Sequence, residues 1–302
     1  MASMASEDLA FFYFVLLWPA GICKQTQGLK CCKPLTGEPA EKDFYLKGLY
    51  PSDISGNYLT GCNECSFNIN EISGLEEDLQ KYASNITCPS TNSTDSWKTL
   101  WETYGVCSGL GQHYYFKKSL ELLKQIDMLS ILSKHDITPT TQHEHDYSVA
   151  EISKAIKTET TYTASIKCSS NQYADYELLE IHLCFDKDAT TIIECPVLPI
   201  FTCPAYVEFA AYSFKDTASK DANPIRMTNK EDSDDVEAMK DCNGRDDLIT
   251  YSGIRIGGVL GVFGGVENEA IRWLFGAKNG VVQGLFKAEN GVAQGLLQSL
   301  WT

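Results

Sequence analysis

Twelve cysteines are spread from Cys23 to Cys242, and two of them, Cys31 and Cys32, are adjacent. An even and dispersed set of this kind is typical of a disulfide framework formed in an oxidising compartment. A zinc site is the alternative for Cys62-x-x-Cys65, but no second C-x-x-C pair or spaced histidine pair follows it. The cysteines therefore predict a cross-linked fold without a structural metal.

Two glycosylation sequons, Asn85-Ile-Thr87 and Asn92-Ser-Thr94, lie in a polar stretch typical of a surface loop. Together with the cysteines they favour the secretory pathway, with an extracellular or vacuolar destination. The apolar run at 9–17 has no basic residues before it and is too short to span a membrane. It is not a clear signal peptide, and we predict a buried strand there.

The formal net charge of the chain is −15. Affinity for nucleic acids comes largely from clustered lysine and arginine side chains that contact phosphates. The basic residues of this chain are scattered, so we expect no strong nucleic-acid binding.

Apolar periodicity predicts both strands and helices within the first 213 residues. Strands are expected at 9–17, 43–49, 176–185 and 190–194, and helices at 69–82, 96–104 and 116–132. Strands and helices do not alternate strictly, which favours an α+β fold built around an antiparallel sheet.

The composition changes beyond residue 213. Residues 214–252 contain an acidic stretch poor in large apolar residues and are interpreted as a linker. Residues 253–302 form a glycine-rich apolar tail, in which Asn279–Leu285 returns as Asn290–Leu296, a shift of 11 residues. Eleven residues fill about three helical turns, so the repeat predicts an amphipathic helix. The favoured role is packing or self-association; the alternatives are contact with a membrane surface and disorder.

Histidine is the side chain most often used for acid–base catalysis and metal binding near neutral pH. The chain has five, at His113, His135, His143, His145 and His182. His143 and His145 form a His-x-His pair, but a solvated loop is favoured there over a metal site. His182 alternates within a predicted strand and is interpreted as a packed or exposed strand residue. We find no motif for a metal, a nucleotide or another cofactor.

Several blocks of residues occur in the order typical of one family. They are "FFYFVLLWPAGIC" at 11–23, "CCKP" at 31–34, "FYLKGLYP" at 44–51, "WKTLWETYGVC" at 97–107, "HYYF" at 113–116, "CSSNQY" at 168–173 and "IIECPVLPIFTC" at 192–203. On these blocks the chain resembles the ribonuclease T(2) family, most closely its plant S-like members, over residues 8–213. The resemblance implies a disulfide-rich α+β domain, with an antiparallel sheet and several packed helices.

The family cleaves RNA with two histidines, and its first histidine lies in the motif "IHGLWP". Here the motif reads "LKGLYP", with Lys47 in place of the histidine and Tyr50 in place of the tryptophan. Leu17 stands where the family has a glutamine that contacts the base. These departures imply that the first acid–base group and part of the nucleotide site are lost.

The second family motif, "HEWEKHGTC", reads "TLWETYGVC" in this chain. Thr99 and Leu100 replace its first histidine and its first glutamate, while Thr103 and Tyr104 replace its lysine and its second histidine. Lysine and tyrosine both have reference pKa values of about 10, so neither is a ready base at neutral pH. The resemblance therefore implies degenerate catalytic positions at Lys47 and on this second segment.

The resemblance also implies how the cysteines pair. The expected disulfides are Cys23–Cys31, Cys32–Cys88, Cys62–Cys107, Cys168–Cys203 and Cys184–Cys195. Cys65 and Cys242 are left over, and we predict a bond between them that tethers the acidic linker to the core.

Loss of the acid–base groups with retention of the surrounding motif predicts a catalytically inactive ribonuclease T(2)-like protein. Inactive members of the family occur in plant storage organs, so a storage or defence-related role is the first hypothesis. The alternative is a non-catalytic binding protein, with Lys47 holding a phosphate or nucleotide in the old cleft, or the tail holding a membrane or partner. Residual endoribonuclease activity is a third hypothesis, which requires large pKa shifts at several positions.

Overall fold

The computed structural model describes residues 8–23, 31–62, 65–141, 146–170, 176–215, 272–278 and 281–287. The chain divides into two units, Met1–Thr250 and Tyr251–Thr302. Within these described ranges, none of the helices has the length and apolar character needed to cross a bilayer.

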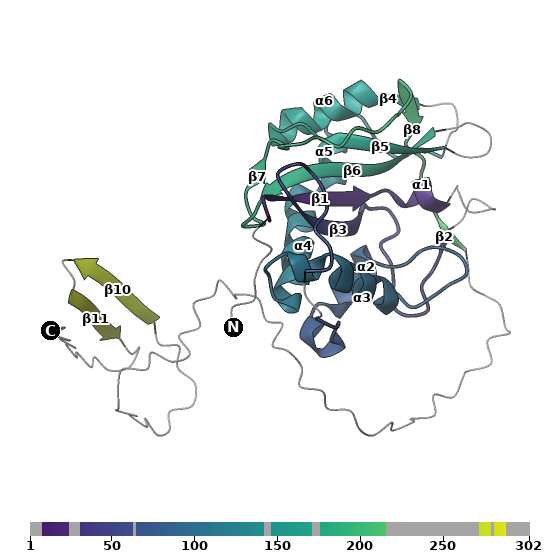
Figure 1. The fold of residues 1–302 in the computed structure, drawn as a ribbon. Coiled ribbons are helices and arrows are strands. Elements are labelled where there is room, and N and C mark those ends of the chain that lie inside the picture. Colours follow the sequence, from purple (N-terminus) through teal and green to yellow (C-terminus); the bar gives the residue numbers. More distant parts are fainter. Residues whose placement is uncertain are drawn as a thin grey trace, which may run out of the picture. The chain divides into compact units, whose positions relative to one another are not determined.

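A seven-stranded sheet forms the centre of the first unit (Figure 1). Its strands are β1 (Phe11–Leu17), β3 (Tyr45–Ser52), β4 (Asp146–Ser148), β5 (Ser165–Ser170), β6 (Tyr176–Asp186), β7 (Ile192–Ile193) and β8 (Tyr206–Glu208). The strand order is β3-β1-β6-β8-β4, and β5 and β7 also pair with β6. All these pairs are antiparallel except β6 with β8. The predicted α+β fold class is confirmed.

A second, two-stranded sheet joins β2 (Cys31–Cys32) to β9 (Phe214–Lys215) in parallel. Residues 214 and 215, which the sequence analysis assigned to the linker, are therefore paired with the body of the first unit.

Strand β1 is buried along its whole length. It pairs with β3 on one edge and with β6 on the other, and its side chains alternate between two packed faces. Phe14 and Leu16 enter the main core, whereas Tyr13 and Val15 lie in or near a smaller cluster on the opposite face. Burial on both faces explains why this strand reads as an unbroken apolar run.

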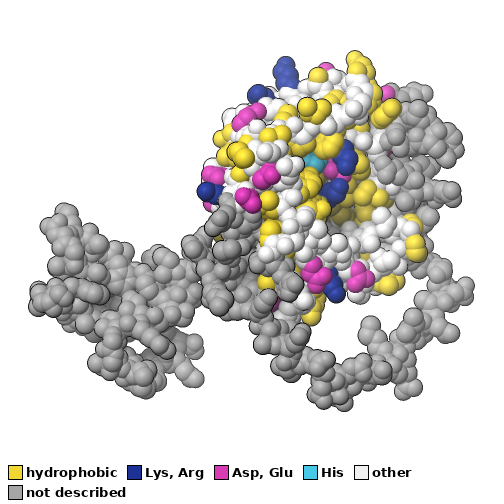
Figure 2. Space-filling view, viewed as in Figure 1, with side chains coloured by type: hydrophobic (Ala, Val, Ile, Leu, Met, Phe, Trp, Pro, Cys, Tyr) yellow, Lys and Arg dark blue, Asp and Glu magenta, His cyan; other side chains and the backbone are white. Residues whose placement is uncertain are grey.

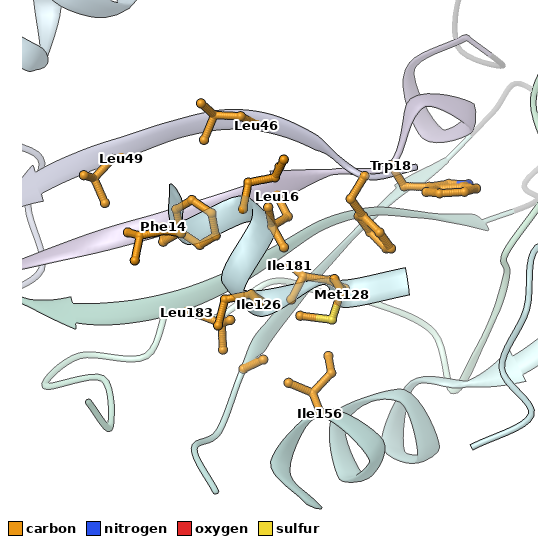
Figure 3. Close-up of a cluster of buried hydrophobic side chains, with 14 of the residues drawn as sticks. Phe14, Leu16, Trp18, Leu46, Leu49, Ile126, Met128, Ile156, Ile181 and Leu183 are labelled. Carbon is orange, nitrogen blue, oxygen red and sulfur yellow. The ribbon is translucent and has the colours of Figure 1, made fainter. Parts of the chain in front are cut away.

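The helices are α1 (Pro19–Cys23), α2 (Glu76–Tyr82), α3 (Thr94–Thr103), α4 (Gln112–Ile126), α5 (Met128–Ser133) and α6 (Val149–Thr160), with the 3-10 helices η1 (Ile69–Ile72) and η2 (Gly105–Cys107). Side chains of α4, α5 and α6 pack on one face of the sheet and form the main core with it. Figure 3 shows Ile126, Met128 and Ile156 gathered near Leu16 and Ile181.

Two predicted helices are each divided in the structure. The helix expected at 116–132 ends at Ile126 and restarts at Met128, because Asp127 has a left-handed φ of 38° and its carboxylate accepts a hydrogen bond from Ser130 N–H. The helix expected at 69–82 is a 3-10 helix followed by a separate α-helix, and Gly74 between them has a φ of 80°. Both predictions had the right place but the wrong continuity.

Five disulfides join pairs of described cysteines in the first unit, and they match the expected pairing. They are Cys23–Cys31, Cys32–Cys88, Cys62–Cys107, Cys168–Cys203 and Cys184–Cys195. Cys65 is also disulfide-bonded. Its expected partner, Cys242, lies outside the described residues, so the Cys65–Cys242 bond stays a prediction.

The amphipathic helix predicted for the tail is wrong for the residues that the structure describes. Arg272–Lys278 and Val281–Lys287 are strands β10 and β11, which pair antiparallel with Lys278 opposite Val281. The two residues between the paired ends are Asn279 and Gly280, and Asn-Gly is the dipeptide most favoured in two-residue hairpin turns. Glycine also has a low helix propensity, which disfavours a helix in these segments.

Candidate functional site

Lys47 lies at an irregularity in β3. Val15 of β1 pairs with Gly48 and Leu16 pairs with Leu46, which leaves Lys47 as the extra residue of a β-bulge. The side chain of Lys47 is 38% exposed, while the other residues of β3 are buried. The bulge thus releases one basic side chain from an otherwise packed strand.

The ammonium group of Lys47 forms an ion pair with Glu180 of β6, which lies on the other side of β1 in the sheet. Lys167 Nζ, from β5, lies 3.3 Å from the same carboxylate oxygen, Oε1, and His182 Nε2 lies 2.8 Å from the second oxygen, Oε2. The Glu180 and His182 side chains are each only 3% exposed. We call these four residues the Glu180 cluster. In Figure 2 a histidine with acidic and basic neighbours lies in a hollow of the molecular surface.

Glu180 is ionised and His182 is neutral at physiological pH. Burial raises the pKa of Glu180, but hydrogen bonds from His182 and Lys47 outweigh burial and lower the pKa to about 2. Burial lowers the pKa of His182 and outweighs the opposing effect of Glu180. Because a carboxylate only accepts hydrogen bonds, Nε2 of His182 carries the ring proton. Its Nδ1 is buried and has no hydrogen-bond partner among the described residues.

Helix α3 and the residue after it bring Leu100 and Tyr104 against β3. A Cβ atom on Gly48 would lie 2.9 Å from Leu100 Cδ1 and 2.8 Å from Tyr50 Cζ. The rings of Tyr50 and Tyr104 meet edge to face with their centroids 4.8 Å apart. The two degenerate motifs are therefore in contact, and an aliphatic side chain fills the position where the family motif has a glutamate.

Three tyrosines, Tyr50, Tyr58 and Tyr104, form a cluster of packed aromatic rings, and Tyr50 contacts Lys47. Tyr50 and Tyr58 stack with centroids 5.0 Å apart, and Tyr50 donates its hydroxyl to the carbonyl oxygen of Lys47 at 3.2 Å. Burial raises the pKa of Tyr50 and also raises the pKa of Tyr58, to about 12. The phenols of Tyr50 and Tyr58 therefore keep their protons at neutral and acid pH and cannot serve as general bases.

The remaining predicted site residues do not add an acid–base group. Thr99 is exposed and donates its hydroxyl to the carbonyl oxygen of Asp95 at 2.9 Å, and Thr103 is half-buried at the end of α3. Leu17 packs in a small core cluster with Tyr45 and is 9% exposed. An aliphatic side chain held in that cluster offers no hydrogen bond to a nucleotide base.

The two described histidines outside the Glu180 cluster, His113 and His135, do not form a site with each other. His113 and His135 are polar surface residues, held by the Glu71 carbonyl and the Glu159 carboxylate. His143 and His145 lie outside the described residues. In the part of the chain that the structure describes, no group of histidine, cysteine, aspartate and glutamate side chains could hold a metal ion.

The two sequons differ in their surroundings. Asn85 is half-buried, and its Nδ2 donates to Thr91 Oγ1 at 2.8 Å. Asn92 is exposed, and its Oδ1 accepts from the Thr94 hydroxyl at 2.9 Å. Glycosylation at both positions stays a prediction.

Sequence reasoning missed the partners of Lys47. Glu180 and Lys167 were not singled out, and His182 was interpreted only as a strand residue. The available signal was the spacing of Glu180 and His182, two residues apart in a strongly apolar strand, which places both on the same face. Burial of two titratable side chains on one strand calls for partners from neighbouring strands.

Comparisons with known proteins agree with this fold. The family model for the ribonuclease T2 family matches residues 9–195. Extracellular ribonuclease LE of Solanum lycopersicum is 37% identical over 69% of this chain and 90% of that protein. A ribonuclease-like storage protein of Panax ginseng is 28% identical over 62% of this chain and 75% of that protein. The crystal structure of RNase NT in complex with 5'-AMP superposes with a TM-score of 0.63 at 35% identity, covering 68% of this chain and 100% of that one.

Proposed function

The chain belongs to the ribonuclease T2 family, and we propose that it is a member that does not cleave RNA and that serves as a plant storage or defence-related protein. The observation that carries this proposal is the state of Lys47. It stands where the family motif has a histidine, and its ammonium group is committed to the Glu180 carboxylate.

The chemistry of the site supports inactivity. Attack by a 2′-hydroxyl needs one group to accept its proton and a second to protonate the departing 5′-oxygen. An ammonium paired with a carboxylate has no lone pair to accept a proton. Leu100 has no proton to give and cannot stabilise a charged phosphorus centre. The imidazole of His182 is buried and already hydrogen-bonded to Glu180.

The relatives support the two parts of the proposal unequally. Relatives named as ribonucleases support the family and its ancestral activity, whereas the ginseng relative is itself named as a storage protein. We infer a secretory route, extracellular or vacuolar, because five disulfides require an oxidising compartment for their formation.

RNA cleavage by the purified, disulfide-bonded full chain tests the proposal. The assay runs from acid to neutral pH beside tomato extracellular ribonuclease LE at the same concentration. Turnover at the buffer level supports an inactive protein, and turnover comparable with the tomato enzyme overturns it. Abundance in the source tissue then separates the roles, since storage requires a dominant protein.

The tail favours a second function, association with another copy of this chain. Among the described residues, β10 and β11 pair only with each other, so each strand has one edge without a strand partner there. An isolated two-stranded hairpin is marginally stable in water, and pairing with a second copy would extend the sheet. Light scattering compares the full chain with a chain that ends at residue 250. Loss of an oligomer on truncation supports association, equal monomeric masses contradict it, and vesicle binding by the full chain alone favours the membrane-surface alternative.

A further inference from the structure

The surroundings of the Glu180 carboxylate resemble those of a bound anion. Each of its oxygens accepts a hydrogen bond, Oε1 from Lys47 and Lys167 and Oε2 from His182. The donor side chains come from three strands, β3, β5 and β6, and they meet at Glu180 on one face of the sheet. Two ammonium groups and one N–H donor are also a suitable set for the oxygens of phosphate or sulfate.

The two lysines remain accessible to solvent, whereas the carboxylate and the imidazole of His182 are buried. The side chains of Lys47 and Lys167 are 38% and 36% exposed, against 3% for Glu180. Phe201 borders the cluster, with its ring 4.9 Å from the imidazole of His182 and 5.4 Å from Lys167 Nζ. An anion from solvent would therefore meet both ammonium groups, but it would also meet the negative charge that already holds them.

The length of the Lys47 side chain and its charge explain how it contacts Glu180 two strands away. Neighbouring strands lie about 4.8 Å apart, so β3 and β6 are separated by about 10 Å across β1. The long stems of Lys47 and Glu180 span this gap, which a histidine at position 47 would not. Glu180 thereby neutralises the cation that the alternative hypothesis assigns to a phosphate.

We propose that Glu180 is an internal anion that occupies an oxyanion site made by Lys47, Lys167 and His182, and that it excludes inorganic phosphate and phosphate esters from this face of the sheet. This goes beyond the loss of catalysis, because removal of acid–base groups prevents cleavage without preventing phosphate binding. The two proposals therefore fail independently: RNA turnover overturns the first and leaves the second to its own test.

The test is a calorimetric titration of the full chain with inorganic phosphate at constant ionic strength. Wild type is compared with Glu180→Gln, which keeps the shape of the side chain and removes its charge. Glu121→Gln is the matched control, since Glu121 is a partly exposed carboxylate paired with Lys118 on α4. Glu180→Gln is expected to bind phosphate at least about tenfold more tightly than wild type and the control, since charge-assisted hydrogen bonds are then released to the ligand.

Each outcome decides the proposal. A folded Glu180→Gln variant that binds phosphate no better than wild type overturns it, as does saturable binding to wild type that matches the variant. A gain that disappears when Lys47→Met is added to Glu180→Gln supports it. The Glu180→Gln variant could be unfolded in a buffer that contains chloride and no phosphate. In that case phosphate is expected to refold the variant, because bound phosphate would take the place of the missing Glu180 carboxylate. Failure of phosphate to refold the variant overturns the proposal.

Discussion

Lys47 and Glu180 are 133 residues apart in the chain, and they form an ion pair across strand β1 of the sheet. One partner reaches solvent and the other is buried, with the buried carboxylate also held by Lys167 and His182. The side chain that motif comparison aligns with a family catalytic histidine is thus part of a charge cluster with Glu180, Lys167 and His182.

Removal of Lys47 should destabilise the fold without changing its architecture. Lys47→Met leaves Glu180 with two donors in place of three, and we expect a loss of about 1–2 kcal/mol, reduced because Lys47 is partly solvent-exposed. Urea unfolding measures the difference. Lys124→Met breaks the exposed pair with Asp78 and should cost less than about 0.5 kcal/mol. Equal effects of the two variants would show that Glu180 does not depend on Lys47.

Stability should fall in two steps as the pH decreases. His182 has a folded-state pKa below its ordinary value of 6.5, so the unfolded chain takes up this proton first and stability declines below about pH 6.5. The folded-state pKa of Glu180 is about 2 against an ordinary value of 4.5, so its contribution is present above pH 4.5 and is lost as the pH falls toward 2. Urea unfolding at neutral pH, about pH 5 and about pH 3 measures both steps. Glu180→Gln should flatten the lower step, and an unchanged lower step would assign it to other carboxylates.

A single histidine should not restore RNA cleavage. Lys47→His provides one imidazole, but Leu100 and Tyr104 still occupy the facing positions. We expect cleavage at background from this variant. The set of five replacements that restores the charged and acid–base positions of both motifs (Lys47→His, Thr99→His, Leu100→Glu, Thr103→Lys and Tyr104→His) should raise cleavage at least about 10²-fold above it.

The matched control for this set carries Lys47→Gln with the same four changes at positions 99, 100, 103 and 104, and it should stay at background. A rate for Lys47→His alone that equals the rate of the full set would show that these four positions are not required. Circular dichroism of every variant checks that the variants without activity are still folded.

The two sequon asparagines should differ in their contribution to stability. Asn85 accepts hydrogen bonds from the backbone and hydroxyl of Thr87 and donates one to Thr91, whereas Asn92 is exposed and accepts hydrogen bonds from the backbone and hydroxyl of Thr94. We expect Asn85→Ala to cost about 1–2 kcal/mol and Asn92→Ala less than about 1 kcal/mol. Thermal unfolding of unglycosylated protein measures both, and a larger loss at Asn92 would contradict the ranking.

The local pattern of apolar residues was sufficient to predict the strands and helices in which those residues recur regularly over a short stretch of sequence. The strands at 11–17 and 176–186 and the helix at 94–103 lie close to their predicted places, because apolar periodicity records the face that each element buries. Helix α6 was not predicted, although Ile152 and Ile156 are spaced four residues apart and are fully buried. Apart from Val149 and two alanines, its other positions are polar, so the apolar signal on one narrow face was weak.

Backbone breaks and the tail were harder to predict, because each depends on a choice between two locally allowed states. Asp127 lies inside a segment whose apolar residues recur at helical spacing. Its left-handed backbone nevertheless ends α4, and its carboxylate caps α5. The 11-residue repeat fits helical turns and also fits a strand–turn–strand unit. The Asn279-Gly280 pair favours the hairpin, and the pairing of β10 with β11 is what the structure has.

The sequence by itself determined the family, the five disulfide pairs and the replacement of the catalytic motif residues, since these are properties of residue order and of resemblance. Only the tertiary structure decided what Lys47 does. Its partner lies two strands away, and sheet order together with a bulge at Lys47 brings Glu180 within reach. A contact of that kind is set by strand register, which no local pattern around either residue encodes.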